Sequence, residues 1–421
     1  MRIKSSHKAA LAALLLSSTG FASLQATEGY FQTAYGARHS ALAGAGLAYV
    51  TDSTGLGLNP AGIAGLGRGY NVGLKIFSPR RQTVGSGQPG LTPLGTVESG
   101  RKYFFIPNLS YVAPAGDKGT WGVGIFANGG MNTSYAAVDR DIQECGGGTG
   151  VFCGGKAGVD LIQAFVTAGY AHQVTDNLKL GVSAKLAVQR FKARGIAPLA
   201  GFSQNPEAFT NNGYDWSTGF GVQVGATYTI DQFSIAATYQ PKIKMSKFDD
   251  YAGLFAEGGD FDIPETFSAG VAYHVNDRIH LMADYRRVNY SDVASVGNPS
   301  TAQAPFGSAG GPGFGWGDVD SVKFGVEIEA NEKFTYRFGV GFNENPISGR
   351  DVTLNVLAPG VVKEHYAAGF SYKTSEKGSL NFSATYVPYH QVSGNGMVNP
   401  NHQISIGMKQ YMTTVEWSYK F

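Results

Sequence analysis

Charged residues are scarce in this chain. Asp, Glu, Lys and Arg make up 15% of its 421 residues, whereas a soluble domain usually carries about 25%. The formal net charge of +2 argues against nucleic acid as a partner, because that partner requires a concentrated basic face. We therefore expect much of the surface to face something other than water.

Long apolar runs are also scarce. Beyond residue 26, no apolar stretch reaches the length of about 18 residues that marks a transmembrane helix. The first 26 residues have a basic start, an apolar run and then small residues, as a secretory signal does. We place cleavage after Ala26, with Ala22 as the alternative. An exported chain with little charge and no spanning helix predicts an outer-membrane β-barrel, because only a helix or a closed barrel pairs every backbone group in lipid.

Cysteine is nearly absent. The two cysteines, Cys145 and Cys153, lie close together in a Gly-rich stretch. This pattern predicts a single disulfide in an oxidising compartment, with two free thiols as the alternative.

Catalytic and metal-binding motifs are missing as well. The eight His residues are scattered without HExxH spacing, and GxSxG does not occur. Gly44 and Gly46 form a GxG pattern, but no strand–turn–helix unit of a nucleotide site surrounds it. We expect no enzymatic activity, no metal and no other cofactor. The alternative is an outer-membrane lipase whose Ser and His meet on one strand face.

Glycine and aromatic residues are abundant, with 59 Gly and 12% aromatics. Segments 177–188 and 214–228 alternate apolar residues with small or polar ones. Such alternation over about ten residues suits a strand with one face on lipid and the other on a polar lumen. The last segment, Tyr411–Phe421, alternates in the same way and ends on an aromatic residue.

Short and long connections alternate along the chain, as the periplasmic turns and extracellular loops of outer-membrane barrels do. We predict tight turns at 113–120, 174–177, 230–232, 276–277, 330–332 and 374–378, and long loops at 78–100, 136–159, 193–213, 246–264, 291–317, 343–363 and 391–403. Counting the strands between them gives about fourteen, an even number that brings both ends of the barrel to the periplasmic side. The sequence therefore predicts an all-β fold with an antiparallel transmembrane β-barrel at 67–421.

The segment Tyr30–Gly65 does not alternate. It is rich in Ala and Gly, has a helical pattern from Ala37 to Ala48, and reaches turn residues at Asn59-Pro60. Its small side chains cannot form a core of their own. We expect residues 27–66 to plug the lumen of the barrel. An open polar porin is the alternative.

Four stretches resemble the FadL/TodX (OMPP1) family of outer-membrane transporters of hydrophobic compounds. They are Gly36–Gly62 with Asp52-Ser53-Thr54 and Asn59-Pro60-Ala61-Gly62, Ile106-Pro107-Asn108 leading into Gly122–Gly130, Tyr251–Pro264, and Asn345–His365. The resemblance implies a fourteen-stranded barrel filled by an N-terminal hatch with short helices. It also implies that substrate is captured among extracellular loops, enters a pocket beside the N-terminus and leaves sideways at a kink in the third strand.

The resemblance places the lateral gate in the third strand, at 121–135. Alternation there is regular up to Phe126 and fails at Asn128, Gly129 and Gly130. Glycine within a strand often marks a bulge or bend, so we assign the gate to these three residues. An ordinary Gly-rich strand end is the alternative.

The resemblance also implies a capture groove formed by two extracellular loops. Its expected lining residues are Ile196, Leu199, Phe202, Phe209, Tyr251, Leu254 and Phe255. The alternative is that these side chains pack the two loops against each other. Tyr30 and Phe31 are expected to cap the luminal pocket, whereas Asn59, Pro60, Ala61 and Gly62 are expected to hold the hatch in place. No single Arg or Lys can be assigned to a substrate carboxylate.

Long-chain fatty acids are the cargo that the resemblance favours, with monoaromatic hydrocarbons or alkanes as the alternative. We expect passive uptake by a monomer surrounded by outer-membrane lipid and lipopolysaccharide. The terminal aromatic, Phe421, resembles the signal that the barrel assembly machinery recognises.

Overall fold

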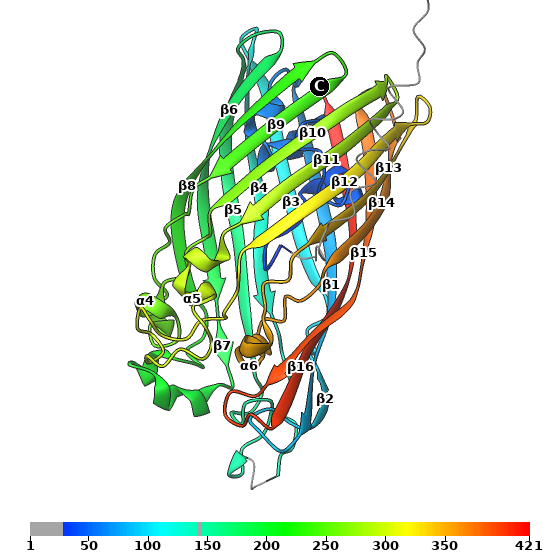
Figure 1. Ribbon diagram of the computed structural model, residues 1–421. Coiled ribbons are helices and arrows are strands. Elements are labelled where there is room, and N and C mark those ends of the chain that lie inside the picture. The colour runs from blue at the N-terminus through cyan, green and yellow to red at the C-terminus, as the bar shows by residue number, and fades with distance from the viewer. Residues whose placement is uncertain (1–27, 142–144) are drawn as a thin grey trace, which may run out of the picture.

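Fourteen antiparallel strands close into a barrel (Figure 1). This computed structural model describes residues 28–141 and 145–421, so the expected signal segment and both cleavage positions lie outside the described residues. The first and last strands, β1 and β16, pair with each other and close the circle. The barrel strands are β1 (Gly69–Gly87), β3 (Phe104–Ala115), β4 (Gly119–Asn132), β5 (Gly158–Gln173), β6 (Leu178–Phe191), β8 (Asp215–Ile230), β9 (Phe233–Gln240), β10 (Thr266–Asn276), β11 (Ile279–Val288), β12 (Val319–Glu329), β13 (Phe334–Asn343), β14 (Glu364–Lys373), β15 (Gly378–Asn395) and β16 (His402–Lys420).

Two short strands and several short helices complete the described chain. β2 (Gly95–Glu98) pairs with β1, and β7 (Ala193–Arg194) pairs with β5. The helical elements are α2 (Gly36–Ala41), η1 (Ser53–Gly57), η2 (Pro60–Ile63), η3 (Ala197–Phe202), η4 (Pro206–Ala208), η5 (Asp249–Tyr251), α4 (Ala256–Gly259), η6 (Tyr290–Asp292), α5 (Ala294–Gly297), η7 (Gly349–Asp351) and α6 (Val352–Asn355). None of the helices in the described ranges has the length and apolar character needed to cross a bilayer.

The barrel strands have an apolar outer face and a polar inner face. In β6, for example, Leu180, Val182 and Leu186 are exposed, whereas Ser183 and Lys185 are buried. Side chains alternate along a strand, so one face of β6 is presented to lipid and the other to the lumen. This arrangement confirms the predicted all-β membrane barrel.

Two strands are longer than the sequence indicated. β1 pairs with β16 from Gly69 opposite Lys420 to Gly87 opposite His402, and β15 continues to Asn395. Parts of the predicted loops 78–100 and 391–403 are therefore strand, and the predicted loop boundaries are wrong there. The extensions lie at the loop end of the barrel, where lipid no longer imposes apolar alternation (Figure 1).

Residues 28–66, here called the plug, lie inside the barrel (dark blue in Figure 1). In the plug, α2 contacts β14 and β15, whereas η2 contacts β6 and β8, so the plug crosses the lumen. The helix predicted for Ala37–Ala48 ends at Ala41, which corrects the prediction. The physical reason is backbone conformation: Ala43, Gly44 and Gly46 have φ values of 52°, 93° and 118°, outside the right-handed helical region.

Glycines in the wall let the plug approach the strands closely. Gly181 of β6 and Gly225 of β8 are cross-strand partners. A Cβ atom on Gly181 would lie 2.3 Å from the Ala61 nitrogen, and one on Gly225 would lie 2.3 Å from Asn59 Oδ1. Larger residues at these two positions would push η2 away from the wall.

Candidate functional site

Buried charges tie the start of the plug to β11 and β12. The Glu28 carboxylate pairs with Arg286 of β11 at 2.5 Å and with Lys323 of β12. Ser321 Oγ donates to the same carboxylate at 3.0 Å. Tyr290, which follows β11, donates its hydroxyl hydrogen to the Glu28 carbonyl. Two cations and two hydroxyls therefore hold this end of the plug against one wall.

A second group of contacts holds α2 and the turn after it to the same wall. Arg38 pairs with Glu327 of β12 at 2.8 Å, and Arg337 of β13 pairs with the same carboxylate at 2.5 Å. Asp284 of β11 accepts the backbone N–H groups of Gly46 and of the next residue, each at 2.8 Å. All these side chains are buried. Among the described residues, every ion pair between plug and barrel goes to β11 or β12.

The barrel wall is incomplete between β3 and β4. Their ladder ends at the pair Leu109–Ile125. Beyond it, β3 continues to Phe104 while paired with β1, and β4 continues to Asn132 while paired with β5. Within the described part of the chain, no ladder pair joins 104–108 to 126–132, and this opening is here called the wall gap. Pro107, which has no backbone N–H and suits an edge strand, lies on its β3 side.

The first residues of the plug take the place of β3 beside residues 128–130 of β4, near the loop end of that strand. The Gln32 N–H donates to the Asn128 carbonyl at 2.8 Å, and the Gly130 N–H donates to the Tyr30 carbonyl at 3.0 Å. The register of β4 against β5 shifts at Asn128, which forms a bulge. A Cβ atom on Gly129 would lie 2.0 Å from the Tyr30 carbonyl oxygen. The three residues assigned to the gate therefore lie at the wall gap, in contact with the plug.

A cavity of about 540 Å³ reaches the wall gap. Side chains from both edges of the gap line it, so the cavity extends to the barrel wall. Its volume falls within the about 300–1,000 Å³ of typical small-molecule sites. Tyr30 and Phe31, which were expected to cap a luminal pocket, both line it. Its apolar lining includes Tyr30, Phe31, Phe77, Phe104, Phe105, Ile106, Met131, Leu161, Trp316, Met408 and Met412.

Three cationic side chains border this cavity, and two of them have strong partners. Lys75 donates to Gln32 Oε1 at 2.7 Å and to a plug carbonyl at 2.9 Å. Arg101 pairs with Asp160 at 2.6 Å. Arg81 is 6% exposed and donates through Nη2 to the Arg101 carbonyl. Its Nε has no hydrogen-bond partner, and Arg81 has no carboxylate partner, in the ranges that the structure describes.

Comparison with known proteins identifies the family. Residues 14–421 match the profile of the outer membrane protein transport proteins (OMPP1/FadL/TodX). The chain belongs to this family. The long-chain fatty acid transport protein of Escherichia coli (strain K12) is 23% identical over an alignment of length 415. The alignment covers 82% of this chain and 90% of that protein. Outer membrane protein P1 of Haemophilus influenzae is 23% identical over 319 residues, which cover 67% of this chain and 66% of that protein.

Solved structures of family members have the same fold. A FadL homologue from Pseudomonas aeruginosa superposes with a TM-score of 0.69 at 16% identity, covering 93% of this chain and 100% of that one. The toluene transporter TodX of P. putida gives a TM-score of 0.68 at 20% identity, covering 92% of this chain and 99% of that one. The predicted family, barrel fold and Gram-negative outer-membrane location are thus confirmed. Members of the family are transporters.

The residues expected to line a capture groove are mostly packed together. Ile196, Leu199, Phe209, Tyr251 and Phe255 are buried, Leu254 is partly buried, and Phe202 is exposed. The Phe255 ring lies 4.6 Å from that of Phe191, and the Phe209 ring lies 5.3 Å from that of Phe306. The cavity among these loops is about 30 Å³, room for about two waters. These ring contacts reach β6 and the loop 291–317, and the Gly253 N–H donates to the Ala208 carbonyl at 2.8 Å, which joins the two loops themselves. This agrees with the alternative interpretation, and a role in capture stays a prediction.

The residues expected to hold the hatch make contacts within the plug and with the wall. Asn59 Oδ1 accepts the Ala61 N–H at 3.0 Å, and its Nδ2 donates to Thr227 Oγ1 of β8 at 3.0 Å. Pro60 takes the first position of η2, where a backbone N–H is not required. A Cβ atom on Gly62 would lie 2.4 Å from a valine side chain of the plug. These contacts fix η2 against β8.

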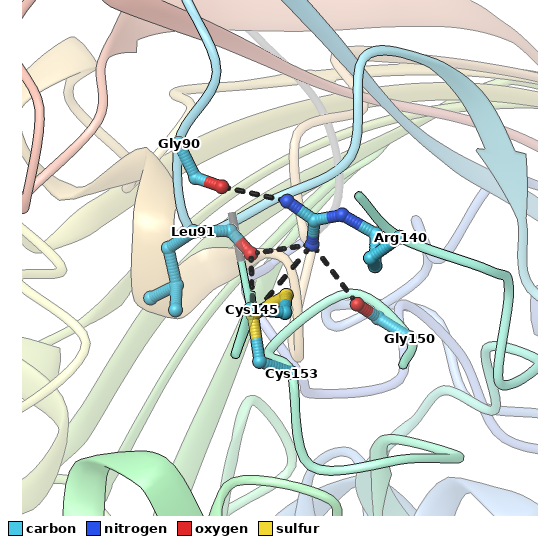
Figure 2. Close-up of a disulfide and its surroundings, with 6 residues drawn as sticks. All are labelled: Gly90, Leu91, Arg140, Cys145, Gly150 and Cys153. Atoms are coloured by element: carbon cyan, nitrogen blue, oxygen red, sulfur yellow. Dashed lines mark hydrogen bonds between the residues drawn. A yellow bond between two sulfur atoms is a disulfide. The ribbon is translucent and has the colours of Figure 1, made fainter. Parts of the chain in front are cut away.

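Cys145 and Cys153 form a disulfide in the loop between β4 and β5 (Figure 2). Beside it, the Arg140 guanidinium donates to the carbonyls of Gly90 at 2.6 Å and of the next residue at 2.9 Å. It also donates to the Gly150 carbonyl at 3.1 Å. The structure thus joins the two cysteines as predicted, and Arg140 connects their loop to the loop that follows β1.

Nothing in the sequence pattern singled out Arg81. It lies in the segment 78–100, which was predicted to be a long loop. Since β1 continues through this segment, Arg80 and Arg81 face opposite sides of the strand. A pair of adjacent arginines at a strand end is the only signal that the sequence offered.

Proposed function

We propose that this chain is a passive channel for the uptake of hydrophobic small molecules, with long-chain fatty acids as the principal cargo. The observation that carries the proposal is the cavity, which has an aromatic and aliphatic lining and reaches the wall gap. Substrate would pass from the extracellular loops into the cavity, displace residues 30–32 from β4, and leave between β3 and β4 into the membrane. Only the substrate gradient would drive this route.

Lateral release is physically favourable for an apolar molecule. Passage through a water-filled pore would hydrate the molecule again, at about 25 cal/mol per Å² of apolar surface. The outer rim of the wall gap is itself apolar: Phe105 is 68% exposed and Ile125 is 47% exposed. A molecule leaving the cavity would therefore exchange one apolar environment for another.

Arg81 supports a carboxylate-bearing cargo. A buried guanidinium without an anionic partner is unfavourable. A carboxylate can accept two parallel N–H bonds from one guanidinium, which is a strong, charge-assisted geometry. A monoaromatic hydrocarbon or an alkane would leave this group unpaired. The charge in the cavity thus favours fatty acids over the alternative cargo.

Uptake of labelled oleate and of labelled toluene by cells that lack their own transporter tests this proposal. We expect Arg81→Gln to lower oleate uptake at low concentration by about ten- to hundredfold, because hydrogen bonds to charged groups contribute about 1.5–3 kcal/mol. Toluene uptake should not change. The matched control is Arg80→Gln, which removes the neighbouring charge on the other face of β1 and should leave both unchanged.

Three outcomes would contradict parts of the proposal. Normal oleate uptake by Arg81→Gln would remove the carboxylate role of Arg81. Uptake of toluene but not oleate by the unmodified chain would replace the cargo and keep the route. Free passage of glucose-sized solutes would show that the plug does not close the lumen, as in a porin.

We further propose that residues 1–26 are removed on export, that the chain acts as a monomer, and that Phe421 contributes to recognition by the barrel assembly machinery. The Phe421 side chain is 60% exposed beyond β16, and its N–H donates to the Arg68 carbonyl at 3.0 Å. Replacing Phe421 by Ala should lower the amount of folded barrel in the outer membrane. Equal amounts of folded protein would argue against this role.

A further inference from the structure

Arg80 of β1 and Lys409 of β16 are directly opposite each other on the outside of the barrel. Side chains alternate along a strand, so Arg80 shares the outward face of β1 with Val72, Leu74 and Ile76, which are exposed. The two cations thus continue a line of lipid-facing residues toward the loop end of the barrel.

Their position along the strand places them at the level of the outer headgroups. Tyr70 and Tyr419 are cross-strand partners near the end that carries the C-terminus, with rings 5.8 Å apart. Arg80 follows Tyr70 by ten residues. At about 3.3 Å per residue and a tilt of about 40°, ten residues span about 25 Å of the membrane normal, the height of the apolar band of such barrels.

The charges at this position are poorly compensated. Lys102 adds a third cation, and it already pairs with Glu98 at 2.8 Å. A groove of about 480 Å³ lies beside these cations, and Glu98 is the one acidic side chain among the described residues that border it. Arg80 and Lys409 form no ion pair with any residue that the structure describes. Like charges directly opposite on neighbouring strands are destabilising, so an anion at this site would relieve their repulsion.

Aromatic residues hold the site in shape. Arg80 Nη2 donates to the Tyr103 hydroxyl at 2.8 Å, and the guanidinium lies 5.0 Å from the centre of that ring. Gln82, on the same face, donates to the Tyr389 hydroxyl at 3.1 Å. A guanidinium has five N–H donors, so further donors of Arg80 are available to a ligand.

We propose that Arg80, Lys102 and Lys409, here called the outer basic cluster, bind the phosphate groups of lipopolysaccharide in the outer leaflet. Phosphate is the anion expected at this depth outside the barrel, and arginine and lysine bind it by fork-like and point-charge contacts respectively. The cluster lies on the lipid side of β1 and the cargo cavity on its luminal side, although Arg81 borders both the groove and the cavity. Arg80, Lys102 and Lys409 are not among the described residues that line the cavity, so phosphate binding and oleate uptake can be tested separately.

Thermal unfolding of the purified full chain in detergent tests this site. The probes are diphosphoryl lipid A, fully dephosphorylated lipid A and inorganic phosphate. We expect diphosphoryl lipid A to raise Tm by several degrees, since a ligand that binds only the folded state stabilises it, and the other two probes to have little effect. The variant Arg80→Gln/Lys409→Gln should lose at least half of that rise. The charge-retaining Arg80→Lys/Lys409→Arg should keep most of it.

The matched control is Arg278→Gln/Lys333→Gln, which removes one Arg and one Lys from exposed turns at the other end of the barrel. It should respond to diphosphoryl lipid A as the unmodified chain does. An equal rise in Arg80→Gln/Lys409→Gln would overturn the proposal. So would an equal effect of dephosphorylated lipid A, which would show acyl-chain binding alone, or of inorganic phosphate, which would show a free-anion site. Oleate uptake by Arg80→Gln/Lys409→Gln should stay normal, which separates this test from that of the proposed function.

Discussion

The plug is held differently at its two sides. Toward β11 and β12 it is fixed by buried ion pairs, in which Glu28 meets Arg286 and Lys323 and Arg38 meets Glu327. At the wall gap it is held by hydrogen bonds without an ion pair among the described residues: backbone bonds to β4 and side-chain bonds from Lys75 of β1. A cavity of about 540 Å³ lies beside these contacts. Taking one member from a buried ion pair costs about 3–5 kcal/mol, whereas a hydrogen bond contributes about 0.5–1.5 kcal/mol. From this difference we propose that residues 30–32 separate from β4 during transport while α2 stays in place.

The largest expected effect on stability comes from breaking the ion pairs that join the plug to β12. Glu327→Gln would leave Arg38 and Arg337 without their shared carboxylate, and we expect it to lower the free energy of unfolding by about 3–5 kcal/mol. Unfolding by guanidinium chloride in detergent measures this change. Glu329→Gln, an exposed position on the same strand, is the control and should stay within about 0.5 kcal/mol of the unmodified chain. A similar small change for Glu327→Gln would show that the ion pairs do not hold the plug.

A substitution at the contact between the plug and β4 should affect stability less and should clearly lower transport. In Gly129→Ala the new methyl group would collide with the Tyr30 carbonyl, 2.0 Å away, and push Tyr30 and Phe31 into the cavity. We expect about a tenfold loss of oleate uptake, with a change in unfolding free energy within the about 1–3 kcal/mol of an overpacked site.

The control for that substitution is Gly341→Ala in β13, where the nearest atom would be 3.5 Å from the methyl group. This is an ordinary contact distance, so uptake should be normal. Normal oleate uptake by both Gly129→Ala and Gly341→Ala would show that the wall gap is not part of the transport route.

The smallest effect is expected at the disulfide, which belongs to neither side of the plug. Cys145→Ser/Cys153→Ser removes a cross-link in the loop between β4 and β5, while Arg140 keeps its carbonyl contacts (Figure 2). We expect faster proteolysis of that loop on intact cells and oleate uptake within twofold of normal. A loss of uptake comparable to that of Gly129→Ala would show that this loop also controls the route.

The barrel was predictable because its signal is local. Alternation such as that of Leu180, Val182 and Leu186 is imposed residue by residue by a wall with lipid on one side. The failure of alternation at Asn128–Gly130 likewise marked the bulge, since the sequence itself carries the glycines. Lipid imposes no pattern beyond the apolar band, and the sequence pattern there misplaced the end of β1.

The candidate site was less predictable because it depends on contacts between distant segments. Glu28 and Arg286 are 258 residues apart, and no local pattern connects them. Phe209 and Phe255 are typical of an exposed capture groove or of a packed loop pair, and only the fold shows that they are buried. The helix expected to reach Ala48 ends early because Ala43 takes a left-handed conformation that alanine rarely adopts.

Reversible cross-linking of the plug to β4 or to β12 shows directly which side of the plug moves during uptake. In a Cys145→Ser/Cys153→Ser background, Gln32→Cys/Asn128→Cys would join the plug to β4. These two residues lie next to the antiparallel bridge between Phe31 and Gly129, and the Gln32 N–H donates to the Asn128 carbonyl. Hydrogen-bonded residues of an antiparallel pair have Cα atoms about 5.5 Å apart, which suits a disulfide. Ala45→Cys/Gly325→Cys would join the plug to β12, where a Cβ atom on Gly325 would lie 3.3 Å from that of Ala45.

Oleate uptake is then compared before and after reduction of each variant. If the plug is fixed at β12 and released at β4, the bond to β4 should abolish uptake until it is reduced, and the bond to β12 should change uptake little. A block by both bonds would mean that the plug must move as a whole. Normal uptake with the bond to β4 intact would mean that substrate leaves by another path, and either result would contradict a plug fixed at β12 and released at β4.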